Sequence, residues 1–290
     1  MRRTITLFTA AFMSAVVVGC GVPADETSEA ISASVPADTR GGLLDWTAAT
    51  VTLPLDAFGM SSSELRTLRA AISIAFARCV TGEHEVSNAV VSEAARSLEP
   101  LVPDADAHHW LYGIWNAPFV AEHGWFPFPG EDPEPMLVET DQATADRCFN
   151  SDVVRALNPI SPAYADEGPS STLVQAGIDS RARTLATTEY QAIMDELEGC
   201  LIDAGYAVSR DEELAQIDVP ESATEEQRLT SMVAAATCND DNRITQRAAD
   251  IEAGFQASEI AEREAEFQAV RAVAAERVAS AHQILNSVGL

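Results

Sequence analysis

The side chains with the widest chemical range lie close together between residues 108 and 128. This stretch holds seven of the 18 Phe, Trp and Tyr residues and three of the five histidines. Four of its rings combine a large apolar surface with a polar atom: Trp110, Tyr112, Trp115 and Trp125. Such rings are common both in protein cores and as anchors in binding sites. We expect them to form the core of the N-terminal half or an exposed platform for a sugar, a peptide or a protein.

The same stretch offers a weak pattern for a metal site. His108 or His109 could act with His123 and with an acid such as Glu122 or Asp106. Adjacent histidines seldom bind one ion together, and no pair of histidines has the i,i+4 spacing of a helical site. We therefore expect no metal and no cofactor.

An enzymatic interpretation of this region is the alternative. Asp104, Asp106, Glu122 and Glu131 are candidate acids and bases for a cell-envelope hydrolase that acts on a wall polymer. Hydrolysis of a glycosidic bond needs two carboxylates at a defined separation, which the sequence does not select. We assign no catalytic residue. A deep pocket lined by the tryptophans would favour the enzyme, and a flat exposed patch would favour a binding protein.

The composition excludes several chemistries. The chain contains no lysine, because all 18 basic residues are arginine. A Walker A lysine, a pyridoxal Schiff base and a Ser-x-x-Lys acylase are therefore impossible. The motifs GxSxG, HExxH and Cys-x-x-Cys are absent as well. The net charge of −27 would repel the phosphates of nucleic acid, so we expect no nucleic-acid partner.

The N-terminus predicts export and lipid attachment. Arg2 and Arg3 precede a short apolar run, and Val-Val-Gly then leads into Cys20. We interpret residues 1–19 as a lipoprotein signal peptide and Cys20 as the residue that receives diacylglycerol. Residues 20–42 are rich in Ala, Ser, Thr and Pro and read as a disordered tether. The protein would then be anchored by lipid on the outer face of the cytoplasmic membrane.

Four cysteines follow Cys20, and an even number in an exported protein predicts two disulfides, with three possible pairings. Cys79 and Cys200 each end a helical pattern with apolar residues seven and three positions earlier and one position later. Each is followed by an alanine-rich segment that carries the next cysteine. This duplicated plan favours the pairs Cys79–Cys148 and Cys200–Cys238, although chance similarity remains an alternative.

A long C-terminal helix is predicted over residues 224–288, where proline is absent and glycine occurs once. Ser222 with Glu225 suggests a capping box at its start, and Cys238 to Asn242 is the best place for a bend. Its second part carries an apolar stripe at helical spacing: Phe267, Val270, Ala274, Val278, Ala281, Leu285 and Val288.

The stripe requires a partner, and the sequence suggests residues 171–204. This stretch is free of proline and carries apolar residues at helical spacing: Ile178, Leu185, Ile193, Leu197 and Leu201. We expect a helical hairpin closed by Cys200–Cys238. Self-association as a coiled coil is the alternative, but alanine-rich seams are weak.

Five segments of the chain form a recognisable set: residues 110–115 (WLYGIW), 121–125 (AEHGW), 143–148 (ATADRC), 190–192 (YQA) and 198–206 (EGCLIDAGY). They resemble a family of uncharacterised surface lipoproteins of high-GC Gram-positive bacteria. In that family a Tyr-Gly segment, a cysteine segment ending in Gly-aromatic, a second cysteine and a long charged C-terminal helix follow in this order. The resemblance implies a helical lipoprotein and brings no catalytic residues.

These observations predict a mainly α-helical chain whose helical modules are held by disulfides. Residues 43–168 would form an N-terminal module with the loop-rich aromatic segment, and residues 169–290 a C-terminal helical hairpin. We expect a non-enzymatic binding or accessory role in the cell envelope, with an envelope protein or a wall polymer as partner. The alternatives are an envelope hydrolase and the solute-binding lipoprotein of a transporter.

Overall fold

The structure is a computed structural model, and it describes residues 41–82, 85–99, 111–124, 140–158, 169–211 and 213–290. Residues Ser32–Leu290 form one compact unit. The predicted signal peptide, Cys20 and nearly all of the predicted tether lie outside the described residues. Within the described ranges, no helix combines the length and the hydrophobicity that crossing a bilayer requires.

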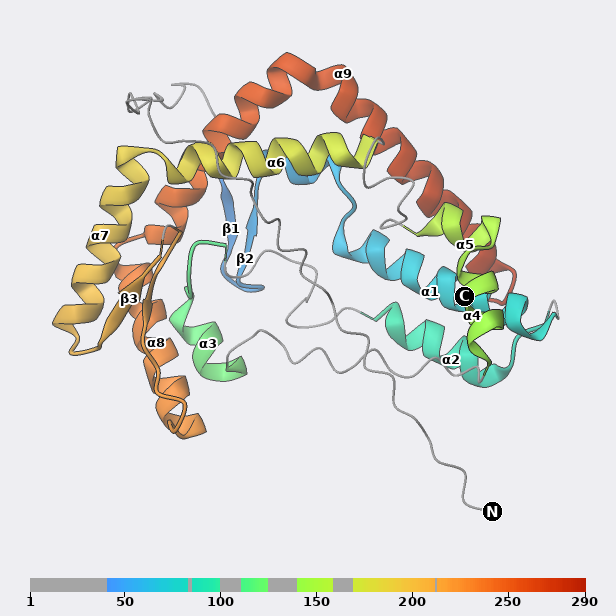
Figure 1. The fold of residues 1–290 in the computed structure, drawn as a ribbon, viewed down its shortest axis with the longest axis horizontal. Coiled ribbons are helices and arrows are strands. Elements are labelled where there is room, and N and C mark those ends of the chain that lie inside the picture. Colours follow the sequence, from blue (N-terminus) through green and yellow to red (C-terminus); the bar gives the residue numbers. More distant parts are fainter. Residues whose placement is uncertain (1–40, 83–84, 100–110, 125–139, 159–168, 212) are drawn as a thin grey trace, which may run out of the picture. The chain divides into compact units, whose positions relative to one another are not determined.

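The described chain is mainly α-helical, as predicted (Figure 1). Its helices are α1 (Ser62–Thr81), α2 (Asn88–Ser97), α3 (Ala117–His123), α4 (Gln142–Phe149), α5 (Asp152–Leu157), α6 (Pro169–Leu185), α7 (Thr188–Asp203), α8 (Glu225–Asp241) and α9 (Ile244–Asn286), with the 3-10 helix η1 (Pro54–Phe58). Two short antiparallel hairpins join β1 (Leu43–Asp45) to β2 (Thr50–Thr52) and β3 (Val208–Arg210) to β4 (Ala215–Ile217).

Both predicted disulfides are present. Cys79 of α1 is bonded to Cys148 of α4, and Cys200 of α7 to Cys238 of α8, with Cα–Cα distances of 5.6 and 5.8 Å. The helix α1, which carries Cys79, begins at a capping box in which Ser61 and Glu64 satisfy each other's backbone N–H groups. It ends at Gly82, whose φ of 69° places it in the left-handed region that glycine adopts at little cost.

The long C-terminal helix breaks where the sequence suggested. α8 ends at Asp241 and α9 begins at Ile244, with Arg243 at a φ of 52° between them. The side chain of Asn239 stabilises the break. Its Oδ1 accepts the N–H of Thr245 at 2.9 Å, and this N–H lies in the first turn of α9, where it has no partner within the helix. The predicted cap was wrong by two residues, since α8 is capped by Thr224 with Gln227 rather than by Ser222 with Glu225.

A second change of direction in α9 was not predicted. Arg263 has non-helical angles, φ −129° and ψ 25°, and Figure 1 shows α9 bending along its course. Arg263 is held there by ion pairs to Glu259 at 2.7 Å and Glu266 at 2.8 Å.

Most of the apolar stripe of α9 is buried, but only part of it has the predicted partner. Ala281 and Leu285 pack in one cluster with α1, including Leu68 and Ile74, rather than against the stretch 171–204. The first residue of the stripe, Phe267, does pack against that stretch, because it shares a cluster with Ala176 of α6. The helical stretch also breaks between α6 and α7, and Ile178, predicted to be apolar core, is 56% exposed.

The hydrophobic clusters cross the boundary that the sequence suggested at residue 168. The largest cluster joins Val51 and Trp115 from the first half to Leu197 and Phe255 from the second. The cluster around α1 likewise includes Leu285 from the end of α9. Packing therefore joins both halves within the compact unit from Ser32 to Leu290.

Truncation of Trp115 tests its place in the core. Its side chain is 1% exposed, so Trp115→Ala should lower the free energy of unfolding by about 3–5 kcal/mol, measured by denaturant titration. Trp46 is the control, because its ring lies 5.1 Å from that of Trp115 while the residue is 54% exposed. Trp46→Ala should cost about 1 kcal/mol. A Trp115→Ala variant as stable as Trp46→Ala would contradict the core assignment.

Candidate functional site

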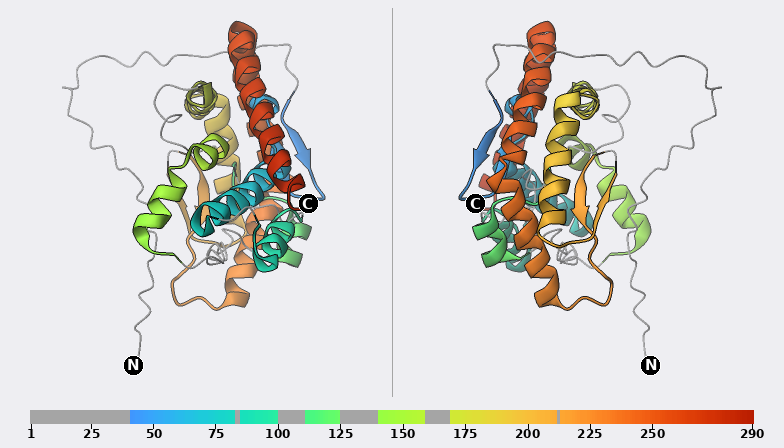
Figure 2. Two further views of the ribbon diagram at one scale, coloured as in Figure 1. Left: turned by 90° about the vertical axis from the view of Figure 1, so that its right-hand side faces the viewer. Right: turned by 90° about the vertical axis from the view of Figure 1, so that its left-hand side faces the viewer.

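An apolar pocket lies between α7 and α8, and we call it the α7–α8 pocket. It has a volume of about 560 Å³, within the range of about 300–1,000 Å³ typical of small-molecule sites. The β3–β4 hairpin lies against α7 (Figure 2) and supplies part of the wall. The lining residues are Gly113, Ile114, Leu197, Leu201, Leu214, Ala215, Gln216, Ile217, Val219, Arg228, Ser231, Met232 and Ala235.

The walls of the pocket are held by covalent and hydrogen bonds. The Cys200–Cys238 disulfide ties α7 to α8 directly next to Leu201. The hydroxyl of Tyr190 on α7 donates to the carbonyl of Glu213, which precedes β4. Arg210 on β3 pairs with Asp195 and Glu198 on α7. The pocket is therefore built on elements fixed to one another.

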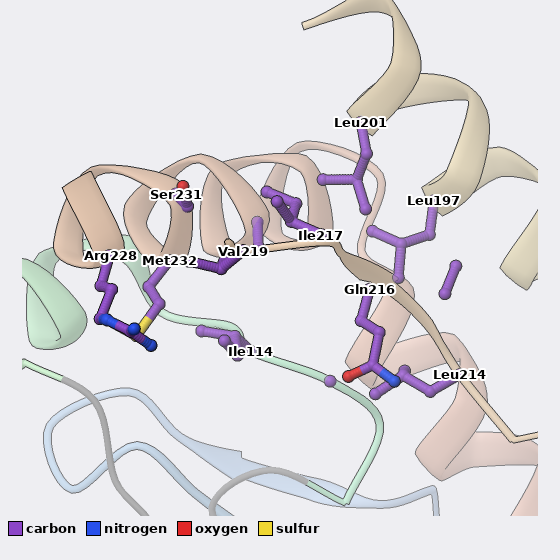
Figure 3. A pocket seen from close by; sticks show the side chains of 13 residues that line it. Ile114, Leu197, Leu201, Leu214, Gln216, Ile217, Val219, Arg228, Ser231 and Met232 are labelled. Carbon is purple, nitrogen blue, oxygen red and sulfur yellow. The ribbon is translucent and has the colours of Figure 1, made fainter. Parts of the chain in front are cut away.

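Among the described lining residues, Arg228 alone carries a charge. Figure 3 shows Arg228 and Met232 at one end of the pocket and Leu197 and Leu201 at the other. Arg228 is half-buried and is held by the turn before α8, since its Nε donates to Ala223 O at 3.2 Å and its Nη2 to Glu221 O at 2.8 Å. The pocket thus has a cationic end and an aliphatic end.

The predicted aromatic segment borders the pocket through its backbone and one aliphatic side chain. Tyr112 and Trp115 are 0% and 1% exposed and belong to the largest core cluster. Gly113 and Ile114, between them, line the pocket. Gly113 has a φ of 94°, and a Cβ there would lie 3.1 Å from Leu214 Cδ1, so glycine suits both the backbone and the close approach.

A buried ionic network fixes this segment from the core side. Glu252 on α9 is 3% exposed and accepts a hydrogen bond of 2.8 Å from the hydroxyl of Tyr112. Its Oε2 also lies 3.4 Å from Nη1 of Arg181 on α6. Arg181 donates to the carbonyl of Leu111 at 2.9 Å and stacks 4.8 Å above the Tyr112 ring. Gln256 donates to the second carboxylate oxygen of Glu252, which leaves neither oxygen unpaired.

The segment is held from α8 as well. Asn239 Nδ2 donates to the carbonyl of Tyr112 at 3.2 Å. Both oxygens of Asp240 accept backbone N–H groups, from Asn116 and Ala117, at 2.8 Å each. These bonds place the N-terminus of α3 over a carboxylate, a favourable arrangement for the helix dipole. The part of the segment that borders the pocket is therefore fixed on both sides.

A second groove runs along α6, and some of the residues that border it are close in sequence to those that line the α7–α8 pocket. This groove has a volume of about 1,020 Å³ and is bordered by Leu111, Arg181, Glu213 and Glu252. Val174 on α6, at 60% exposure, also lines it. Part of its lining is polar, because Arg181 and Glu252, which form the buried ion pair, both border it.

The structure tests two of the four predicted aromatic binding residues. Tyr112 and Trp115 are core residues, so the prediction that these two rings form an exposed platform is wrong. Trp110 and Trp125 lie outside the described residues. His123 and Glu122 are exposed at the end of α3. Within the described ranges no cluster of His, Cys, Asp and Glu could hold a metal ion. His108, His109, Asp104, Asp106 and Glu131 lie outside those ranges.

Of the residues that line the pocket, Leu197 and Leu201 were predicted only as apolar packing residues, and none was predicted as a site residue. Leu214, Ile217 and Val219 follow one another at short spacing between the two segments predicted as helices, where the sequence predicts no element. Glu252 could have been noticed, because it falls on the apolar face that Ala248 and Phe255 share in α9. Comparisons with protein-family models, curated proteins and solved structures found no match.

The pKa of Tyr112 gives a test of the buried network. Burial and the nearby Glu252 carboxylate raise the pKa of Tyr112 well above its ordinary value. An unfolded tyrosine loses its proton near pH 10 while the folded one retains it, so stability should fall above that pH by up to about 1.4 kcal/mol per pH unit. Below pH 10 this contribution is fully present. Tyr112→Phe should remove this part of the alkaline slope and cost about 1–3 kcal/mol at neutral pH.

Unfolding titrations at neutral pH and between pH 9.5 and 11 measure both effects. Burial also raises the pKa of Tyr190, and Tyr190→Phe is the matched variant. It should retain the part of the slope that Tyr112 causes. An unchanged alkaline slope in Tyr112→Phe would contradict a buried neutral phenol at this position.

Proposed function

We propose that this protein is an exported, lipid-anchored binding protein of the cell envelope that holds an apolar small molecule in the α7–α8 pocket. The observation that carries the proposal is the lining, which is aliphatic apart from Arg228, Ser231, Gln216 and the backbone at Gly113. Apolar walls with a few placed polar groups are typical of sites that bind small molecules.

The composition of the pocket supports binding rather than chemistry. None of its described lining residues is a His, Cys, Asp or Glu. Ser231 therefore has no general base among the lining residues, and acid–base catalysis needs such a group within hydrogen-bond distance of the reacting atom. Of the acids considered for a hydrolase, Glu122 is exposed on α3 and does not line the pocket. This supports a binding role over that alternative.

Two further features support the location. Two disulfides suit an oxidising compartment outside the cytoplasm. The apolar run before Cys20 is typical of lipoprotein export, and two acyl chains on one cysteine anchor a protein stably. An anchored binding protein would keep its pocket close to the membrane, where apolar molecules of the envelope are concentrated.

Occlusion of the pocket tests the proposed function. The neutral, solvatochromic dye Nile red should bind the compact unit Ser32–Leu290 with one molecule per chain and with a blue shift in emission. Ala235 lines the pocket, so Ala235→Trp should weaken dye binding at least tenfold because the indole fills the space. Thr237→Trp is the control, since Thr237 is exposed on the same helix. Equal dye affinity in Ala235→Trp and the parent chain would refute the pocket as the binding site.

The anchor is tested separately in cells. In the full chain, Cys20→Ala should abolish incorporation of a labelled fatty acid, because the acylated thiol is lost. The protein should then appear in the medium or remain as an uncleaved precursor, detected by immunoblot. Cys79→Ala is the control for loss of a cysteine elsewhere and should still be labelled. Undiminished labelling of Cys20→Ala would refute lipidation at this residue.

A further inference from the structure

The two ends of the α7–α8 pocket differ in chemistry, and this difference indicates what the pocket binds. Arg228 and Met232 lie at one end, and Leu197 and Leu201 lie at the other (Figure 3). Both leucines are at most 3% exposed, so the aliphatic end is the deeper one. Arg228 is half-buried and therefore stands nearer the mouth. A ligand that satisfies both ends has a charged head and an alkyl tail.

The guanidinium of Arg228 is oriented by the protein and retains capacity for a ligand. Its Nε and Nη2 donate to the carbonyls of Ala223, Pro220 and Glu221 in the turn before α8. In the described part of the chain, Nη1 makes no hydrogen bond and no carboxylate pairs with Arg228. A guanidinium whose partners are neutral carbonyls has no negative charge paired with it and can donate to an anion.

We infer that the α7–α8 pocket binds a single-chain anionic amphiphile, with its carboxylate or phosphate head at Arg228 and its alkyl chain directed towards Leu197 and Leu201. This inference rests on the proposed function and specifies its ligand class. A volume of about 560 Å³ suits one small ligand rather than a large assembly. Each methylene group that enters the aliphatic end strengthens binding about fourfold.

The strongly acidic surface does not prevent an anion from binding here. The net charge of −27 is spread over the chain, and salt screens exposed charges over about 8–10 Å. The head group would contact Arg228 directly, because a charge-assisted hydrogen bond brings the guanidinium nitrogen and the anionic oxygen to within about 3 Å of each other. The local guanidinium therefore determines the sign of the head, while the surface charge lowers the association rate.

A comparison of matched ligands tests the inference. Dodecanoate, dodecyl phosphate and the neutral dodecanol have the same alkyl chain and are measured by displacement of Nile red from Ser32–Leu290, below their micellar concentrations. At least one anion should bind about tenfold more tightly than dodecanol, and the tighter anion identifies the head group. Decanoate should bind more weakly than dodecanoate, because two methylene groups are missing.

Variants of Arg228 show whether this residue sets the preference. In Arg228→Gln the affinity ratio of anion to alcohol should fall to about one, and in Arg228→Lys most of the ratio should remain. Arg247→Gln is the charge control, since Arg247 pairs with Glu196 on the surface and does not line the pocket, and its ratio should equal that of the parent chain. The ratio compares two ligands on the same variant, so a change in stability alone does not alter it.

The outcomes separate the two proposals. If dodecanol and both anions bind with equal affinity, or if Arg228→Gln keeps the ratio, the anionic class is wrong and the apolar pocket stands. If no ligand displaces the dye and Ala235→Trp binds dye like the parent, the proposed function fails as well. A tenfold ratio that disappears only in Arg228→Gln supports the inference.

Discussion

The buried carboxylate of Glu252 is the constraint on which much of this structure depends. An unpaired charge at 3% exposure would cost several kcal/mol, and removal of one partner of such a pair typically costs about 3–5 kcal/mol. Glu252 sits on α9, and its partners come from α6 and from the aromatic segment. Satisfying the carboxylate therefore requires Arg181 and Tyr112 to meet on one face of α9. The neighbouring Gln256 extends this requirement to η1, because its Oε1 accepts the N–H of Leu55 at 3.0 Å.

Sequence patterns predicted the features that depend on local spacing. The pairs Cys79–Cys148 and Cys200–Cys238 followed from two helices with the same apolar spacing, and both are present. The buried stripe of α9 and the break after α8 followed from helical periodicity and from a run of polar residues. These features are encoded within a few turns of helix, so one sequence suffices to find them.

Features that depend on contacts between distant residues were missed. The stripe of α9 could pack against any long apolar face, and periodicity alone does not distinguish α1 from α6. The bend at Arg263 was missed as well, because no proline or glycine marks it. The pair Arg181 and Glu252 is 71 residues apart and is not visible as a motif. The pocket combines residues from four separate segments for the same reason.

The aromatic segment connects the core to the proposed site. The ring of Tyr112 faces the buried carboxylate, the ring of Trp115 lies in the largest cluster, and Gly113 and Ile114 between them face the pocket. Gly113 and Ile114 lie directly between Tyr112 and Trp115, so the two buried rings fix their position. Core packing and the shape of the pocket are therefore linked through the same few residues. The aromatic segment, for which the sequence suggested either a core or a binding role, therefore contributes to the proposed site mainly by holding one of its walls.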